Sequence, residues 1–279
     1  MIVTDKYIIF AQVISDTDNT IINIVSKNNL ELLETIDTYC FGHANDMAYN
    51  SNTDEIYILS GASSSDKITK FKINSNFEIT DLQEINLSRK YSSIAYDSDH
   101  DYFIGYNSPN IIIMNNKFEE IKSIDAPSNL VHQGISYWNN HIYFSCYERG
   151  TITASNPNAI YNNKEKNSSL IYMYDINGNL KRSLYIPNTS ISGEIESVSL
   201  CGNSDIYFAY NVKIDEKETV SIYKSDVLSK VAKIELTNEI TKKSYIQNEE
   251  RLDLTGGKIK VIYNDNSEES INMNQEGVE

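Results

Sequence analysis

The sequence predicts an all-β protein whose main part is a β-propeller of about five four-stranded blades, with six possible. Two observations predict this fold. Short alternating strands recur with a period of about 45 residues, the size of a propeller blade, and no amphipathic helical period lies between them. A four-stranded sheet cannot bury both of its faces alone, whereas radial stacking of blades buries them. We therefore favour a propeller over a double β-sandwich.

Each repeat opens with a hairpin whose two strands are joined by a short polar turn, such as residues 51–55 or 97–101. Alternating apolar residues on both sides of a polar turn are typical of paired strands. The expected strand pairs are residues 2–4 and 7–10, 47–50 and 56–58, 94–97 and 102–104, 135–138 and 142–144, and 198–200 and 206–208.

A second hairpin completes each repeat. Its first strands are expected at residues 21–25, 68–73, 111–114, 170–174 and 220–223. A turn such as 74–76 or 177–179 leads to a closing strand, for example residues 180–186. This pattern predicts a propeller domain over residues 1–236. One segment, residues 148–168, is longer and rich in Asn, Thr and Lys, which indicates an exposed insertion of the kind that often binds a partner.

Residues 237–279 do not continue the repeat. They contain Tyr245, the run Leu252-Asp253-Leu254-Thr255-Gly256, a strand at 258–263, a turn at 264–267 and a strand at 269–273. These features resemble the first half of a bacterial Ig-like domain of surface and phage structural proteins. The closing strands of such a domain are missing. Because half a sandwich leaves strand edges unpaired, the resemblance implies a fragment, or a tail that pairs with the propeller or a partner.

Composition excludes several function classes. The chain has a formal net charge of −15 and a pI near 4.7, which disfavours binding to nucleic acid or to an anionic membrane surface. No apolar run is long enough to insert into a membrane, and no charged leader precedes IVTDKYIIF, so we expect neither a membrane span nor a secretion signal.

The three cysteines, Cys40, Cys146 and Cys201, are far apart and form no CxxC motif. This spacing indicates reduced, structural thiols rather than a disulfide framework or a zinc site.

Polar residues precede or open the innermost strand of several repeats. Such residues crowd around a propeller axis, where convergent polar groups are the usual sign of a ligand site. The candidates for binding a small molecule, a sugar or a cation are His43, Asn45, Asp46, Tyr91, His132, Gln133, Glu194 and Glu196, with Ser92 and Ser93 beside them. The alternative is that these groups hydrogen-bond one another and the backbone, and so hold the blades together.

Metal and catalytic chemistry are weaker hypotheses. His43 and His132 with the carboxylates of Asp46, Glu194 and Glu196 have suitable ligand types, but their convergence depends on the propeller, and we assign no metal and no cofactor. Residues 97–101 carry alternating carboxylates like the start of a calcium loop. They lack the glycine expected at the sixth position, where Tyr102 stands, so they fit a hairpin turn better.

No nucleophile elbow, zinc-protease, P-loop or Rossmann motif occurs. Glu194 and Glu196 could serve glycoside hydrolysis, but we predict that the chain is not an enzyme. Four tyrosines at expected loop or strand ends could stack on carbohydrate: Tyr147, Tyr161, Tyr185 and Tyr210. We favour blade packing for most of them.

The stretch GHANDMAYNS followed by an apolar strand resembles repeats in tail-associated and surface proteins of low-GC Gram-positive bacteria and their phages. The resemblance implies a non-enzymatic structural or recognition module of a phage tail or phage-tail-like particle, in a baseplate or fibre. It would be assembled in the cytoplasm, act outside the cell as part of the virion, and bind a cell-surface glycan or neighbouring tail proteins, with repeated copies in a symmetric particle. The alternatives are a fragment of a cell-surface adhesin and a propeller hydrolase or lyase acting on polysaccharide.

Overall fold

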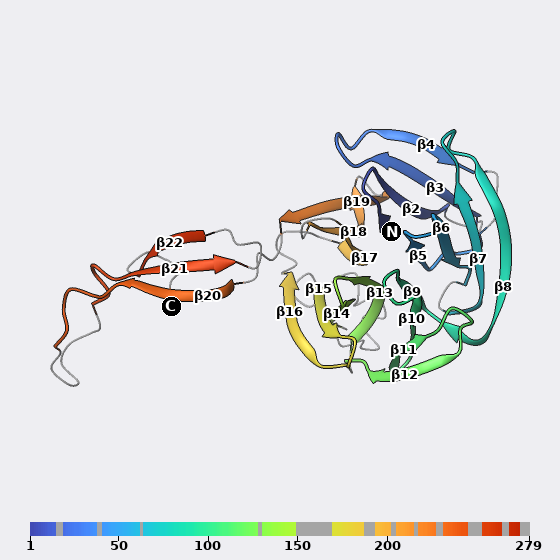
Figure 1. Ribbon diagram of the computed structural model, residues 1–279. Coiled ribbons are helices and arrows are strands. Elements are labelled where there is room, and N and C mark those ends of the chain that lie inside the picture. The colour runs from blue at the N-terminus through green and yellow to red at the C-terminus, as the bar shows by residue number, and fades with distance from the viewer. Residues whose placement is uncertain are drawn as a thin grey trace, which may run out of the picture. The chain divides into compact units, whose positions relative to one another are not determined.

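The structure is a computed structural model of residues 1–279 (Figure 1). It describes residues 1–14, 19–37, 41–61, 64–127, 130–148, 169–186, 193–201, 205–214, 217–226, 231–244, 253–263 and 268–273. The chain divides into two compact units, Met1–Ser225 and Asp226–Glu279. We call them the propeller unit and the C-terminal unit.

In the described residues, the propeller unit contains five antiparallel sheets, and each is a meander of consecutive strands. Blade one holds β1 (Ile2–Val3), β2 (Tyr7–Ile14), β3 (Asn19–Ser26) and β4 (Leu32–Ile36), and blade two holds β5 (Asp46–Asn50), β6 (Glu55–Leu59), β7 (Ser65–Ile73) and β8 (Ile79–Tyr91). Blade three holds β9 (Ser93–Asp97), β10 (Tyr102–Asn107), β11 (Asn110–Met114) and β12 (Glu120–Asp125). Blade four holds β13 (Leu130–Trp138), β14 (His141–Glu148), β15 (Ser169–Asp175) and β16 (Leu180–Ile186), and blade five holds β17 (Gly193–Cys201), β18 (Asp205–Ile214) and β19 (Lys217–Asp226).

The first strand of every blade lies nearest the propeller axis, and β4, β8, β12 and β16 lie on the outside (Figure 1). Neighbouring inner strands contact one another around the whole ring, and β1 contacts both β5 and β17. The first and fifth blades therefore close the ring. This arrangement confirms the predicted all-β propeller.

Inner strands such as β5 and β9 are buried along nearly their whole length because each is covered on both faces. In β5, Met47 packs into the core shared with blade one, whereas its neighbour Ala48 packs into the core shared with blade three. Successive side chains of a strand point to opposite faces, so each inner strand supplies both of its neighbours. Ile94 and Ala95 of β9 divide in the same way, toward blades two and four.

Contacts between blades one and five complete the ring. Met1, Val3 and Ile8 pack against Cys201, Tyr207 and Ala209. The Nζ of Lys27 donates to the Sγ of Cys201 at 3.2 Å, and that thiol lies 3.2 Å from the carbonyl oxygen of Thr4, to which it donates. Cys146 and Cys201 are both buried free cysteines, and Cys40 lies outside the described residues.

Three blades use the same turn between their third and fourth strands. The Oδ1 of Asn74, Asn115 and Asp175 accepts hydrogen bonds from the backbone N–H groups two and four residues later, at 2.8–3.0 Å. The residue three positions later has a positive φ in each turn, and it is Phe77, Phe118 or Gly178. An Asx side chain that satisfies two turn amides fixes the hairpin and hence the register of the outer strand.

The C-terminal unit is a three-stranded antiparallel sheet in the order β20 (Val231–Asn238), β21 (Lys258–Tyr263) and β22 (Glu268–Asn272). The predicted strands at 258–263 and 269–273 are present. The predicted domain boundary after residue 236 falls within β20, which pairs with β21. The predicted extents of the two domains stay predictions. The Ig-like identity of this unit stays an expectation from the sequence.

Two of the tyrosines expected at loop or strand ends are buried in the structure. Tyr147 and Tyr210 are 5% and 1% exposed, so they pack within the propeller. Tyr161, the side chain of Tyr185 and nearly all of the expected insertion at 148–168 lie outside what the structure describes. No helix in the described part of the chain is long and apolar enough to cross a membrane.

Candidate functional site at the propeller axis

The stretch Gly42 to Asp46 forms a corner that leads the chain into β5. Gly42 has a φ of +65°, and a Cβ there would overlap the carbonyl oxygen of Ser60. The backbone N–H groups of His43 and Asn45 donate to Ser60 and Leu59 at 3.0 and 2.9 Å. Only glycine combines this backbone conformation with so close an approach, so this part of the sequence is shaped first by the turn.

Asp46 stands at the start of β5, and its carboxylate binds three inner strands. Its Oδ1 accepts from the N–H of Met47 at 2.8 Å, and its Oδ2 accepts from Ile94 at 3.1 Å and Ile135 at 3.3 Å. The two longer bonds reach β9 and β13, which are edge strands whose outward N–H groups have no ladder partner at these positions. One buried side chain therefore joins blades two, three and four.

Blade one supplies a positive charge beside this carboxylate, and blade five supplies polar side chains beside that charge. The buried amine of Met1 lies near Asp46 and Glu196 and donates to the Oγ of Ser197 at 3.3 Å. Burial raises the pKa of Asp46 from 3.8 to about 6, opposed by the Met1 amine and by the three backbone N–H groups. Burial likewise lowers the pKa of the Met1 amine, opposed by Asp46 and then Glu196. With these groups, all five blades contribute to one polar cluster on the axis.

Two further pairs join neighbouring blades. The Nδ2 of Asn45 donates to the carbonyl oxygen of Ser92, and the Nε2 of Gln133 donates to the Oε1 of Glu194. Gln133 and Glu196 occupy irregular positions where β13 and β17 shift register against β14 and β18. Such bulges redirect a side chain, and the structure uses them to place both residues among partners from other blades.

Tyr91 and His132 lie in the packing between blades. Tyr91 is 3% exposed, and Gly105 leaves room for its ring, because a Cβ there would lie 2.6 Å from Cδ1. The His132 ring packs between Phe144 and Tyr106, with both ring centroids 4.2 Å away, and its Nε2 lies 2.5 Å from the Oγ of Ser93. These surroundings give both residues a structural role.

Burial lowers the pKa of His132 from 6.5 to about 3, slightly opposed by the backbone of Ser145. The ring is therefore neutral at physiological pH. A neutral imidazole can accept the Ser93 hydroxyl proton at Nε2 while Nδ1 carries the hydrogen. That Nδ1 has no hydrogen-bond partner of good geometry among the described residues.

The positions of these side chains do not support the hypothesis of a metal site. Within the described ranges, no three His, Cys, Asp or Glu side chains gather closely enough to hold a metal ion. Of the eight predicted ligand-site residues, the structure brings Asp46 and Glu196 together around the Met1 amine and pairs Gln133 with Glu194. Binding of a ligand by this set stays a prediction.

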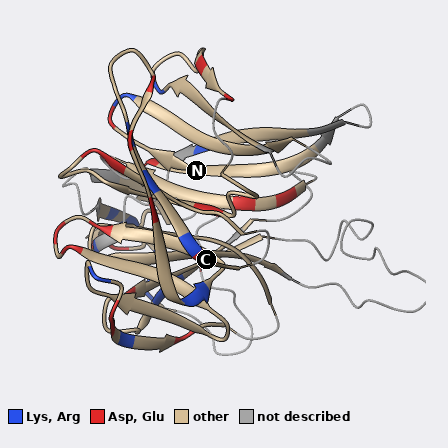
Figure 2. Cartoon of the chain, turned by 90° about the vertical axis from the view of Figure 1, so that its right-hand side faces the viewer, with Lys and Arg blue, Asp and Glu red and all other residues tan. Residues whose placement is uncertain are grey.

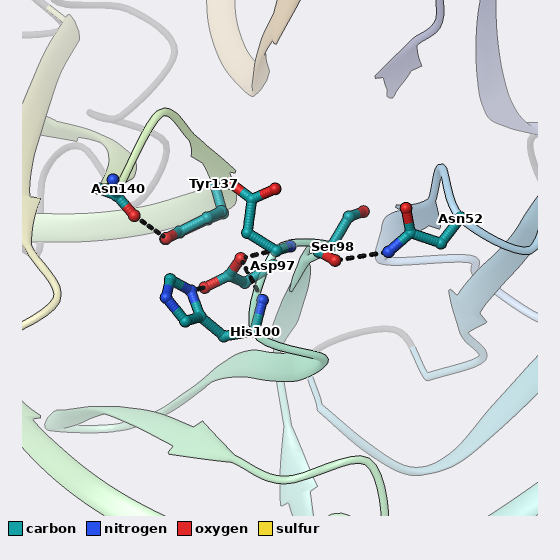
Figure 3. Close-up of polar contacts among 7 residues, drawn as sticks. Asn52, Asp97, Ser98, His100, Tyr137 and Asn140 are labelled. Carbon is teal, nitrogen blue, oxygen red and sulfur yellow. Dashed lines mark hydrogen bonds and ion pairs between the residues drawn. The ribbon is translucent and has the colours of Figure 1, made fainter.

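The opposite end of the inner strands carries a second polar network, which includes the segment 97–101 considered above as a hairpin turn (Figure 3). Asp97 is fully buried and accepts from the N–H groups of Asp99 and His100 at 3.0 and 3.2 Å, with the His100 Nδ1 at 2.7 Å. The Nδ2 of Asn52 donates to the carbonyl oxygen of Ser98 at 2.5 Å and so ties blade two to blade three. The segment 97–101 is thus a self-bonded turn, in line with its interpretation as a hairpin.

Tyrosines of the inner strands bind the turns that follow them. The hydroxyls of Tyr49, Tyr96 and Tyr137 donate to Asp54, Asp101 and Asn140. Each acceptor has a φ near +60°, a conformation that Asp and Asn tolerate better than most residues. A sequence signal existed, namely a Tyr in the first strand followed within five residues by an Asp or Asn at the end of the turn.

Comparison with known proteins adds a general likeness. No protein-family model matches the chain, and no curated protein matches it. Similar solved structures include the WD40 domain of Neurospora crassa Pan2, with 13% identity, a TM-score of 0.41, and coverage of 75% of this chain and 59% of that one. The chain thus spans less than two thirds of the Pan2 domain.

The RRP9 WD40 repeats match with 10% identity and a TM-score of 0.40 over 74% of this chain and 71% of theirs. A Bacteroides caccae protein of unknown function matches with 13% identity and a TM-score of 0.38 over 79% and 73%. At these scores we draw no functional argument from the similarity.

Proposed function

We propose that this chain is a non-enzymatic recognition and assembly module, in which a closed propeller presents its turns to a neighbouring protein or a cell-surface glycan. The observation that carries the proposal is the use of the axial polar groups. Asp46 binds three inner strands, Gln133 binds Glu194, and His132 is held between two aromatic rings. A general acid or base must reach a substrate proton, whereas these groups are engaged in holding blades together.

The surface chemistry supports a binding role. Figure 2 shows Asp and Glu at many turns of the chain, with Lys and Arg interspersed. Together with a net charge of −15, this distribution favours solubility of the chain before it assembles with a specific partner. The resemblance of GHANDMAYNS to tail-associated repeats suggests the setting, a phage tail or phage-tail-like particle.

Electron microscopy of particles purified from the source culture, combined with labelling by an antibody against the chain, tests the setting. We expect the label at repeated positions on a tail or baseplate. Label on the cell wall with none on particles would favour the adhesin alternative and overturn the particle assignment.

A paired assay tests the non-enzymatic role. The purified chain is mixed with cell-wall polysaccharide, and both co-sedimentation and the release of new reducing ends or unsaturated products are measured. We expect co-sedimentation without release. Product release that is lost in Glu194→Gln or Glu196→Gln, but retained in the exposed control Glu84→Gln, would overturn the proposal in favour of a polysaccharide hydrolase or lyase.

A further inference from the structure

The turns between the first and second strands of blades two, three and four meet at one end of the inner strands (Figure 3). They are residues 51–54, 98–101 and 139–140. Blades two and three are tied together here, because the Nδ2 of Asn52 donates to the carbonyl oxygen of Ser98 at 2.5 Å. We call the surface formed by these three turns and the side chains beside them the turn face.

Tyr137, near the end of β13, brings the turns of blades three and four together. Its hydroxyl donates to the Oδ1 of Asn140 at 3.2 Å. Burial raises the pKa of Tyr137, and the neighbouring carboxylates of Asp97 and then Asp99 raise it further. Asp99 of blade three and Asn140 of blade four therefore lie around one hydroxyl group.

Several polar atoms of the turn face have no hydrogen-bond partner among the described residues. They are the Nδ2 of Asn140, which is a donor, and two acceptors, the Oδ1 of Asn52 and the carboxylate of Asp99. All three residues are exposed, so no part of the propeller unit covers them. Donors and acceptors are thus available side by side on three blades.

An aromatic surface lies beside these atoms. The His100 ring stacks on Tyr102 with ring centroids 5.9 Å apart, and the His100 side chain is 49% exposed. Its Nδ1 lies 2.7 Å from the buried carboxylate of Asp97, which holds the ring in place and leaves Nε2 available. A ring that is already fixed loses little freedom when a ligand packs against it.

The chemistry of the turn face fits a neutral polysaccharide better than a protein or an anionic polymer. A sugar hydroxyl both donates and accepts hydrogen bonds, and the C–H groups of a sugar pack on aromatic rings. Protein partners need large buried anchors, and none of the exposed large apolar side chains in the described residues lies in these turns. The exposed carboxylates of Asp54, Asp99 and Asp101 would repel an anionic polymer.

We propose that the turn face binds a neutral polysaccharide, with sugar hydroxyls on Asn52, Asp99 and Asn140 and one sugar ring against His100. This inference rests on the proposed recognition role, for which it names the surface and the class of ligand.

Affinity electrophoresis of the full chain tests the ligand class. Cell-wall polysaccharide from the source culture is separated by anion exchange into a neutral and a phosphate-containing fraction, and each fraction is cast into gels at increasing concentration. We expect saturable retardation by the neutral fraction and weaker retardation by the other. Stronger binding to the phosphate-containing fraction would overturn the proposed ligand.

The double variant Asp99→Ala, His100→Asn tests the surface. It removes the carboxylate and the ring, while the new amide can still donate to Asp97. We expect the apparent Kd for the neutral fraction to rise at least about 10-fold. The matched control is Asp66→Ala, Tyr223→Asn, which removes an exposed carboxylate from β7 and an exposed ring from β19 and should bind like the wild type.

Far-UV circular dichroism confirms that each variant is folded, and Asp99→Ala alone serves if the double variant is not. Wild-type affinity in the folded variant would overturn the turn face as the site while the proposed recognition role stands. Failure of the wild type to bind either fraction would overturn this inference together with the glycan part of the proposed function, and would leave the role in binding neighbouring proteins.

Discussion

At the residue scale, a few buried polar groups hold the centre of the propeller together. Five inner strands meet with their edges toward the axis, and each edge leaves backbone groups to be satisfied. The Asp46 carboxylate accepts hydrogen bonds from backbone N–H groups of β9 and β13, and the hydrogen bond from the Met1 amine to Ser197 joins blades one and five. A carboxylate suits the position because it accepts several N–H bonds at once.

Replacement of Asp46 by Asn should destabilise the propeller strongly. An amide offers one acceptor oxygen, turns an NH₂ group toward backbone donors, and removes the charge beside the Met1 amine. We expect a loss of about 3 kcal/mol or more in the free energy of unfolding, measured by urea denaturation. Asp66→Asn, at an exposed position on β7, should change it by less than about 0.5 kcal/mol. Equal losses in the two variants would contradict this account.

The pH dependence of the free energy of unfolding should reflect protonation of the His132 imidazole. Its pKa is about 3 in the folded chain against 6.5 as the ordinary value, so between these values the folded state binds fewer protons and stability falls as the pH falls. Asp46 acts oppositely between about pH 6 and 3.8, where the folded state binds more protons. A comparison of variants separates the two effects.

His132→Phe removes only the histidine contribution while it keeps a ring between Tyr106 and Phe144. The stability of the wild type relative to this variant should fall by roughly 2–3 kcal/mol between pH 6.5 and 4. Denaturant titrations at several pH values provide the measurement. His141→Gln, at the first residue of β14, is the matched control for removal of an imidazole, and the same pH profile for both differences would refute the assignment.

At the element scale, repeated turns fix the pairing and register of the strands that they join. Asn74, Asn115 and Asp175 play one role in three blades, and the tyrosines of three inner strands bind the ends of the turns that follow. Local sequence fixes these hairpins, since donor and acceptor lie within five residues of each other. That locality is why their strands could be predicted from the sequence.

Asn115 provides a test of this shared role. Asn115→Ala leaves the N–H groups of Lys117 and Glu119 without their acceptor and should reduce the free energy of unfolding by about 1–2 kcal/mol. Asn115→Asp combined with Glu119→Asn should be close to neutral, because it reproduces Asp175 and Asn179 of blade four, which make the same bonds, whereas Asn115→Asp alone would face the Glu119 carboxylate that the Asn115 amide binds. Chemical denaturation of the variants checks this, and a loss in the double variant as large as in Asn115→Ala would rule it out.

At the scale of the whole molecule, the ring closes through blades one and five, which differ most from the others. Blade one contributes only Ile2–Val3 as its inner strand, and blade five ends at β19. The contacts of Lys27 with Cys201 and of Met1 with Ser197 join these blades by side chains.

The sequence by itself determined the strand periodicity, the hairpins and the propeller class, because alternation and turn chemistry act over a few residues. It also located the polar residues that enter the inner strands. Only the tertiary structure decided their roles. Whether Asp46 meets a ligand or the N–H groups of Ile94 and Ile135 depends on how three blades stack, and burial of His132 depends on rings from two blades. The pairing of β20 with β21 likewise joins segments that are separated in the sequence, and the local pattern of either strand does not specify its partner.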